Sequence, residues 1–455
     1  MYPMAKLSRA RALTRECVTG PCYTLLLMTR LTVVPALLLA AATAAAQDPA
    51  ALLVLNDVNL IDGTGAAARP HVRIVIRGER IESIQDASPE PLPAGAEVRN
   101  LSGMTVIPGL IDAHVHLTSG PGNDQQIAQT LRFGLLGGVT SVRDMGGDNI
   151  VLAALAKSAS DVNQAAPRIY YSTLVAGPQW FADPRPKASA HGGVAGEVAW
   201  MRALTPESDL SAIVSAGKAT GATGLKIYAD LPASLVALVT AEAHRQGLKV
   251  WAHSAVFPAK PSQVVAAGVD VISHSVYLGA EGMNPPPDSY EAARRGLGID
   301  YSKTPVDGEA ITALFRLMKE KGTILDETLF VTNASKRNDD DPVWRFTVAV
   351  TRRAHEMGLP LAAGTDSFGS PARDTTPNLH REMQLLVEEC GLTPLEAIHA
   401  ATYEGARAIG IAKSYGTVQA GKVADLVILR EDPSSDIRRT KNIAAVVKGG
   451  VVYQR

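Results

Sequence analysis

The pattern of apolar and polar positions divides the chain into two β-rich ends and a long middle part in which strands and helices alternate. The strands expected at the two ends are residues 52–60, 72–77, 80–84, 424–429, 443–447 and 451–453. Gly78 marks a hairpin turn in the first group. Because both ends share this character, they predict a small discontinuous β-sandwich domain formed by residues 48–107 and 416–455.

In the middle part, short β-branched runs alternate with segments of helical periodicity, which is typical of repeated βα units around a parallel sheet. The expected strands end, in chain order, near His116, Asp144, Leu174, Tyr228, His253, His274, Asp326 and Asp366. Apolar residues at helical spacing indicate helices at 234–246, 309–321, 343–357 and 378–390. These units predict an α/β fold, a (β/α)8 TIM barrel over residues 108–415, with its chemistry at the C-terminal ends of the strands.

Other local signals refine this barrel. Thr393 and Glu396 form a capping box that opens a helix toward Ile409. Three connections that follow strands are long, at residues 176–205, 276–308 and 368–377. Loops of that length in a compact domain usually shape a pocket, so we expect them to select the substrate.

Residues 1–47 are expected to carry a secretory signal peptide that is no part of the fold. Arg30 precedes an apolar run at 31–42, and small residues follow before Gln47, which is the order of a cleavable signal. The run is short for a bilayer span, and we expect translation to start at Met28. The alternative is a membrane anchor that stays attached. Cleavage predicts a periplasmic or secreted protein without a stable membrane span.

Cysteine content and charge narrow the class of protein further. Beyond the predicted signal only Cys390 is left, so no disulfide can form within one subunit. With 44 Lys and Arg against 45 Asp and Glu, the formal charge of −1 does not indicate nucleic acid as a partner. A hydrophobic fraction of 46% suits a compact enzyme acting on a small molecule, and we expect a homo-oligomer.

The polar residues at the predicted strand ends suggest a metal site. Residues 109–116 end in His114 and His116, whose side chains point to the same face of a strand. The other strand ends contribute Lys226, His253, His274 and Asp366. Imidazoles and a carboxylate bind a divalent cation, which lowers the pKa of a bound water so that it can attack the substrate. Taken singly, a histidine is more often a core residue and Asp366 a helix N-cap, but all of them at one barrel mouth favour a hydrolytic metal centre.

These motifs resemble those of the amidohydrolase superfamily. The matching segments are PGLIDAHVH at 108–116, GLK at 224–226, AH at 252–253, ISH at 272–274, GTD at 364–366 and GTVQAGKVADLV at 416–427. Within the superfamily the chain is most similar to imidazolonepropionase-like and Xaa-Pro or Xaa-Arg dipeptidase-like metal-dependent hydrolases. The similarity covers nearly the whole chain after the predicted signal.

The resemblance implies a binuclear site, with two divalent metal ions that we expect to be Zn2+. His114, His116 and Asp366 would hold the more buried ion, and His253 and His274 the more exposed one. Lys226, carboxylated by carbon dioxide, would bridge them, because a carbamate supplies two oxygens where an ammonium supplies no ligand. The alternative is an ordinary lysine beside a single ion. In the family, the residue at Asp366 is also the catalytic base and acid.

Tyr228 and His191 are predicted to bind substrate. Tyr228 lies two residues after Lys226 on the same face of the strand, and its alternative is a packed aromatic residue. His191, in the sequence AHGG at 190–193, resembles a glycine-flanked histidine that relatives place over the site, although alanine here stands where they often carry glycine. Structural or surface pairing is expected for Arg143, Asp144, Arg373 and His380, and a pocket wall or plain packing for Trp180, Phe181, Trp200 and Tyr277.

The leading functional hypothesis is a secreted amidohydrolase that cleaves the amide bond of a dipeptide or an N-acyl amino acid. A lactonase or esterase is an alternative because the same chemistry serves both bonds. A deaminase is disfavoured because Ser254, Ala255 and Val256 follow His253 where such enzymes often carry a glutamate. A non-catalytic binding protein is disfavoured because every expected ligand position is filled.

Overall fold

The computed structural model describes residues 51–87, 92, 94–118 and 124–455. The predicted signal peptide, with its start at Met28, lies outside the described residues. Within the described part, no helix is both long and apolar enough to cross a membrane.

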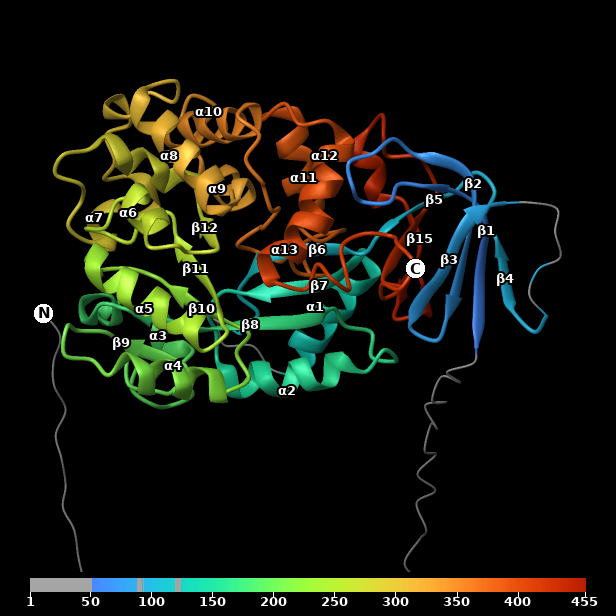
Figure 1. Cartoon of the computed structure of the whole chain (residues 1–455), viewed down its shortest axis with the longest axis horizontal. Helices are drawn as coiled ribbons and strands as arrows, with labels where there is room; N and C mark the ends of the chain where they lie inside the picture. Colours follow the sequence, from blue (N-terminus) through green and yellow to red (C-terminus); the bar gives the residue numbers. More distant parts are fainter. Residues whose placement is uncertain (1–50, 88–91, 93, 119–123) are drawn as a thin grey trace, which may run out of the picture. The chain divides into compact units, whose positions relative to one another are not determined.

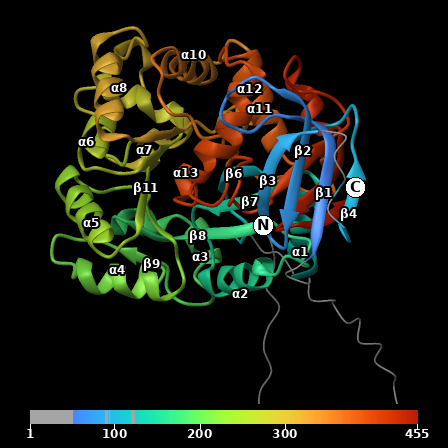
Figure 2. The ribbon, with the colours of Figure 1, turned by 45° about the vertical axis from the view of Figure 1, so that its right-hand side comes forward.

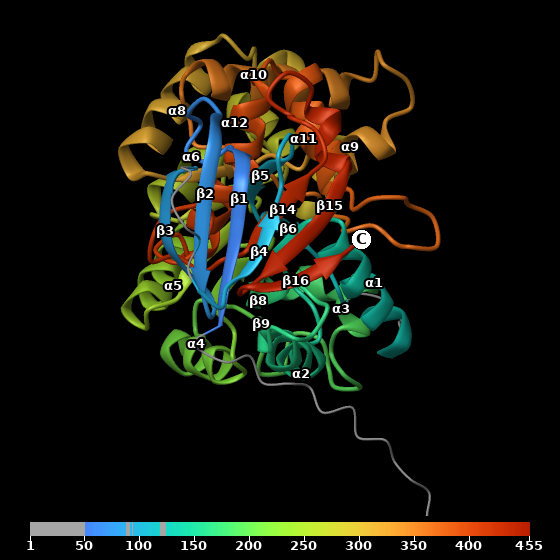
Figure 3. The same ribbon diagram turned by 90° about the vertical axis from the view of Figure 1, so that its right-hand side faces the viewer.

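Strands from the two ends of the described chain hydrogen-bond into one eight-stranded, largely antiparallel sheet (Figure 3). Its order is β16-β15-β14-β5-β1-β2-β3, and β4 pairs with β1. The strands are β1 (Leu52–Leu60), β2 (Arg69–Arg77), β3 (Arg80–Asp86), β4 (Glu97–Asn100), β5 (Thr105–Pro108), β14 (Leu426–Leu429), β15 (Ile443–Lys448) and β16 (Val451–Gln454). The ends meet where Ile107 of β5 pairs with Val427 of β14, and one face carries its own apolar core.

A second, parallel sheet forms the barrel, in the order β13-β12-β11-β10-β8-β7-β6 with β9 paired to β8. Helices lie outside these strands (Figures 1 and 2). The strands are β6 (Leu110–Val115), β7 (Val139–Asp144), β8 (Arg168–Ala176), β9 (Met201–Ala203), β10 (Gly224–Ile227), β11 (Lys249–His253), β12 (Val271–Ser273) and β13 (Ile324–Asp326). The predicted α/β barrel with a separate β-sheet built from both ends is confirmed.

The eighth barrel position is irregular. The segment predicted as the last strand forms only an isolated parallel bridge, between Leu361 and Leu325. The backbone N–H of Ala362 donates to the Leu325 carbonyl, and that of Ala113 donates to the Ala363 carbonyl, so the segment still joins β13 to β6. A Cβ atom added to Gly364 would lie 2.3 Å from Asp326 Oδ1 and 2.7 Å from His114 Cβ. Glycine at position 364 therefore allows the eighth barrel segment to pack directly against β6, the strand that carries His114.

The helices follow the predicted periodicity closely. They are α1 (Asp124–Leu136), α2 (Asn149–Ser160), α3 (Arg185–Ala188), α4 (Leu210–Ala219), α5 (Ala233–Arg245), α6 (Pro261–Ala266), α7 (Tyr290–Ala293), α8 (Glu309–Lys321), α9 (Leu329–Ser335), α10 (Pro342–Glu356), α11 (Leu379–Glu388), α12 (Pro394–His399) and α13 (Gly405–Ile409). The Thr393 capping box is present, and one π-helical turn joins α12 to α13. Short elements that the sequence did not predict, including β9, α3 and α7, lie in the two longest loops.

Candidate metal centre

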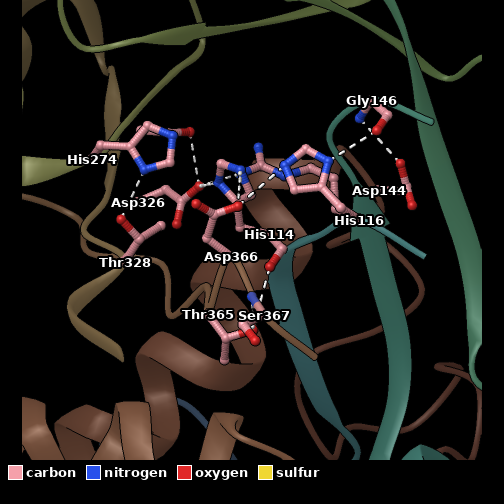
Figure 4. A network of polar contacts seen from close by, with 12 residues as sticks. His114, His116, Asp144, Gly146, His274, Asp326, Thr328, Thr365, Asp366 and Ser367 are labelled. Atoms are coloured by element: carbon pink, nitrogen blue, oxygen red, sulfur yellow. Dashed lines mark hydrogen bonds and ion pairs between the residues drawn. The ribbon is translucent and has the colours of Figure 1, made fainter. Parts of the chain in front are cut away.

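Two histidines and one aspartate from opposite ends of the barrel sequence meet at its mouth (Figure 4). His114 lies in β6 and His116 just after it, so the alternation of the strand turns both rings the same way. Asp366 Oδ1 lies 3.1 Å from His116 Nε2 and 3.6 Å from His114 Nε2. One ligand atom from each of the three residues lies within 4.8 Å of the others, which is close enough to bind one metal ion.

The other predicted ligands lie on the next strands around the barrel. Lys226 lies in β10, His253 ends β11, and His274 follows β12. The ring centroids of His253 and His274 are 4.7 Å apart, and those of His274 and His114 are 4.8 Å apart. The four imidazoles therefore form one continuous cluster, with the second group directly beside the first.

Three of the four imidazoles have Nδ1 fixed by a neighbouring oxygen. His114 Nδ1 lies 2.7 Å from Asp326 Oδ2, His116 Nδ1 lies 2.9 Å from the Gly146 carbonyl, and His274 Nδ1 lies 2.9 Å from Thr328 Oγ1. A carboxylate and a carbonyl only accept, so in the neutral form His114 and His116 carry the ring proton on Nδ1, and Nε2 of each ring faces Asp366. That tautomer is the one that binds a metal ion through Nε2.

The residues also pass a test for fit to a second ion. His253 Nδ1 and Lys226 Nζ are buried, and neither has a hydrogen-bond partner among the described residues. Leaving such atoms unpaired in a protein interior is costly, and native structures rarely do so without a reason. His253 belongs to the imidazole cluster and Lys226 lies beside it, so a metal ion or other ligand bound among these side chains would give both nitrogen atoms a partner.

Burial and mutual repulsion keep most of these bases neutral. Burial and the nearby Lys226 lower the pKa of His253, and burial lowers the pKa of His274 to about 3. Burial lowers the pKa of Lys226 to about 7. Burial alone would raise the pKa of Asp366, but the surrounding imidazoles outweigh it and lower that pKa, so Asp366 is an anion. Burial alone would lower the pKa of His116, but its contact with Asp366 outweighs burial and raises that pKa. The neutral His253 and His274 beside the anionic Asp366 are in the protonation states that metal binding needs.

A cavity of about 500 Å³ opens directly above this cluster. His116, His253, His274 and Asp366 form part of its wall. Its other residues come mostly from the long loops and are largely apolar or aromatic, among them Trp180, Arg185, Met201, Tyr228, Tyr277 and Tyr290. The Tyr228 ring lies 4.1 Å from the His253 ring, and its hydroxyl lies 3.4 Å from Arg185 Nη1. The cavity is thus apolar with a single arginine close to the cluster.

Comparison with known proteins places this site in a family. The model of the Amidohydrolase family matches residues 105–453, which is most of the chain. This chain belongs to the amidohydrolase family. The predicted resemblance to that superfamily is therefore confirmed.

The individual relatives of this amidohydrolase match it over shorter segments or at low sequence identity. An imidazolonepropionase of Geobacillus kaustophilus is 37% identical over 107 residues, 23% of this chain and 25% of the relative. An ochratoxinase of Aspergillus niger is 31% identical over 156 residues, 31% of each chain. A solved Xaa-Pro dipeptidase with bound methionine superimposes with a TM-score of 0.70 at 23% identity, over 89% of this chain and all of that one. The sequence alignments thus span less than a third of these relatives, and the structural likeness supports the fold.

The amidohydrolase site includes residues that sequence reasoning left out or placed elsewhere. Of the two residues predicted to bind substrate, Tyr228 lines the cavity, whereas His191 is absent from the residues that line it and has Nδ1 2.6 Å from Asp148 Oδ2. Asp326 was recognised only as a strand end, although it contacts His114 directly. Arg143, expected to pair structurally, is fully buried against Asp326. Position at the end of a barrel strand was the sequence signal that pointed to Asp326.

Proposed function

We propose that this protein hydrolyses a carbon-nitrogen amide bond with the help of two divalent metal ions. The observation that carries the proposal is the pairing of a preformed His-His-Asp group with two buried, unpaired nitrogen atoms on the adjoining strands. His114, His116 and Asp366 would hold one ion, and His253 and His274 the other. Bound ions of this kind acidify a water and polarise a carbonyl, and we infer Zn2+ because imidazole and carboxylate ligands suit it.

Lys226 is proposed to join the two groups as a carbamate. Its neutral Nζ would form a bond to the carbon of carbon dioxide and release one proton, leaving a carboxylate with two oxygens. A cationic Lys226 would repel both metal ions, whereas the carbamate attracts them and supplies ligands. The unpaired, fully buried position of Nζ supports this modification.

Asp366 is proposed to move the proton during catalysis. Its side chain is 24% exposed and lines the cavity, so it can reach both a water and a substrate. An anionic carboxylate in that position can take the proton of the attacking water and then deliver it to the departing amine.

The cavity supports an amide substrate that carries a carboxylate and an apolar group. Asp183 holds Arg185 Nε and Nη2 at 3.0 and 2.9 Å, which leaves Nη1 directed at the Tyr228 hydroxyl. Arg185 and Tyr228 together can donate to a substrate anion. Trp180 and Tyr290 supply flat apolar surface beside them. A dipeptide or N-acyl amino acid combines these features, and relatives named ochratoxinase and Xaa-Pro dipeptidase agree with this class.

Export to the periplasm or the medium is proposed from the sequence of residues 28–47. N-terminal sequencing of the protein from fractionated cells tests it. Cleavage after residue 46 or nearby is expected, and a start intact at residue 1 in the cytoplasm would contradict it.

The function is tested with metal-depleted protein to which Zn2+ is added back. We expect about two ions per chain and hydrolysis of N-acyl amino acids or dipeptides that disappears in the depleted protein. The same panel contains matched esters, lactones and amides that lack the carboxylate. If only esters or lactones are hydrolysed, the protein is an esterase or lactonase and the amide proposal is wrong. If the metal-depleted protein hydrolyses the substrates at the same rate, the proposed metal centre is wrong.

A further inference from the structure

The turn after β13 contacts histidines of both proposed metal groups. Asp326 is the last residue of this strand, and Thr328 comes two residues later. Asp326 contacts His114, and Thr328 contacts His274. Figure 4 shows both contacts from the same short segment. None of the atoms in this turn is a proposed ligand.

Asp326 is itself firmly held. Its Oδ2 accepts from Arg143 Nη2 at 2.9 Å and from Ser273 Oγ at 2.9 Å, in addition to His114 Nδ1. Asp326 and Arg143 are both fully buried. Three donors converging on one oxygen leave this carboxylate a single position, so the His114 ring that it contacts is fixed as well.

Thr328 adopts a left-handed backbone conformation, with φ 51° and ψ 51°. A β-branched residue rarely takes this conformation, and such outliers cluster where a side chain must be aimed. The turn is held in it from the other side, because the buried Glu382 accepts from the backbone N–H groups of Leu329 and Phe330. The result of this arrangement is that Thr328 Oγ1 lies against His274 Nδ1.

We propose that Asp326 and Thr328 are positioning residues that fix the imidazoles of the two metal groups separately, Asp326 for the His114 ion and Thr328 for the His274 ion. The inference rests on the proposed binuclear function. Hydrogen bonds to the outer nitrogen of a metal-binding histidine set its orientation and basicity, and their loss typically weakens metal binding about 10–100-fold. Because both residues belong to one turn, the backbone also sets the spacing of the two rings.

The test measures metal affinity directly, by competition of Zn2+ with a chelator and metal counting, without reference to turnover. Thr328→Val keeps the β-branched shape and removes the hydroxyl, and we expect one of the two ions to bind about 10-fold or more weakly. Thr328→Ser restores the hydroxyl and is expected to restore the affinity. Asp326→Asn is expected to weaken the other ion. Thr351→Val is the matched control, because the hydroxyl of this buried threonine donates to Ser275 Oγ and not to an imidazole nitrogen.

The outcomes separate this inference from the proposed function. A wild-type protein that binds no metal ion overturns both. A wild-type protein with two ions and a Thr328→Val variant of unchanged affinity overturns the inference alone. It is also overturned if Thr328→Ser is as weak as Thr328→Val, or if Thr351→Val shows the same loss, since either result indicates general disturbance of packing. Thermal unfolding of each variant identifies a failure to fold, and Thr328→Ser then decides the question.

Discussion

The two halves of the candidate metal centre are built differently. In the first half, His114, His116 and Asp366 contact one another, and the outer nitrogens of both rings are bonded. In the second half, Lys226 Nζ and His253 Nδ1 are buried without partners among the described residues. The outer nitrogens of the first half are thus paired within the protein, whereas the two unpaired nitrogens of the second half would acquire partners from a ligand. This difference predicts opposite responses to mutation.

The largest effect is expected from Asp366→Asn in the first half. The amide keeps the shape but cannot take up the proton, so kcat/KM should fall by about 10³-fold or more. Steady-state kinetics against the best amide substrate measure this loss, and thermal unfolding checks that the fold is retained. The control is Asp340→Asn, because the Asp340 side chain is 94% exposed. Substantial turnover by Asp366→Asn would remove this residue from the mechanism.

Arg143→Met tests how firmly the first half is held. Arg143 is buried against Asp326, so its removal leaves a buried carboxylate with one partner fewer. Breaking a buried pair in this way typically lowers the free energy of unfolding by about 3–5 kcal/mol. Denaturant unfolding of the metal-free protein measures it. Arg345→Met, at an exposed ion pair, should change stability by less than about 1 kcal/mol. Equal effects of the two variants would show that the first half is not specially stabilised.

Lys226→Met tests the second half, and the expected sign is opposite. In the folded metal-free protein burial lowers the pKa of Lys226 to about 7, against 10.5 for a free lysine. Protonated Lys226 therefore destabilises the fold at pH 6, and methionine should raise the free energy of unfolding by about 3–5 kcal/mol. Between pH 7 and 10.5 only the unfolded chain binds this proton, so wild-type stability rises with pH and the advantage of methionine fades.

Lys448→Met is the control for that result. Lys448 is also buried, but its Nζ donates to the carbonyls of Ala159, Asp161 and Gln164 at 2.7, 2.9 and 3.0 Å. Methionine leaves three acceptors unpaired there, so stability should fall. If Lys226→Met also lowers the stability of metal-free protein, Lys226 has a partner in solution and the contrast between the halves is wrong.

The smallest effect is expected from Tyr228→Phe, which changes the cavity and keeps both halves intact. Loss of the hydroxyl beside Arg185 removes one donor to a substrate carboxylate, worth about 1 kcal/mol. KM for a carboxylate-bearing amide should rise about 3- to 10-fold, with a smaller change for the neutral amide. Tyr453→Phe, in the terminal sheet, serves as the control. An equal change for both substrates would assign Tyr228 to packing.

Much of the first half could be predicted from local sequence. The spacing of His114 and His116 by one residue places both rings on the same face of a strand wherever that strand lies. Position at the end of a predicted strand made Asp366 a candidate ligand of the first half, and His253 and His274 candidate ligands of the second. The prediction was less accurate where strand pairing is irregular. The eighth barrel segment was predicted as a strand, but it forms only an isolated bridge, and Gly364 packs closely on Asp326 instead.

Residues whose role depends on a distant partner could not be predicted. Nothing in the local sequence of Asp326 distinguishes it from any other strand-end aspartate, because its partners His114 and Arg143 lie 212 and 183 residues away along the chain. Arg185 lines the cavity because the fold brings its Nη1 to within 3.4 Å of the Tyr228 hydroxyl, 43 residues away along the chain. His191 was predicted from its motif alone; its ring lies 2.6 Å from Asp148 Oδ2, and its contact with substrate stays a prediction.

The sequence by itself determined the barrel, the terminal sheet and the candidate ligand residues, because periodic apolar positions and strand ends are local properties of the chain. Only the tertiary structure decided which ligand nitrogens are already bonded and which are unpaired. That distinction depends on atoms brought together by packing of the whole barrel, and no short segment carries it. The contrast between the two halves of the metal centre is therefore a property of the fold.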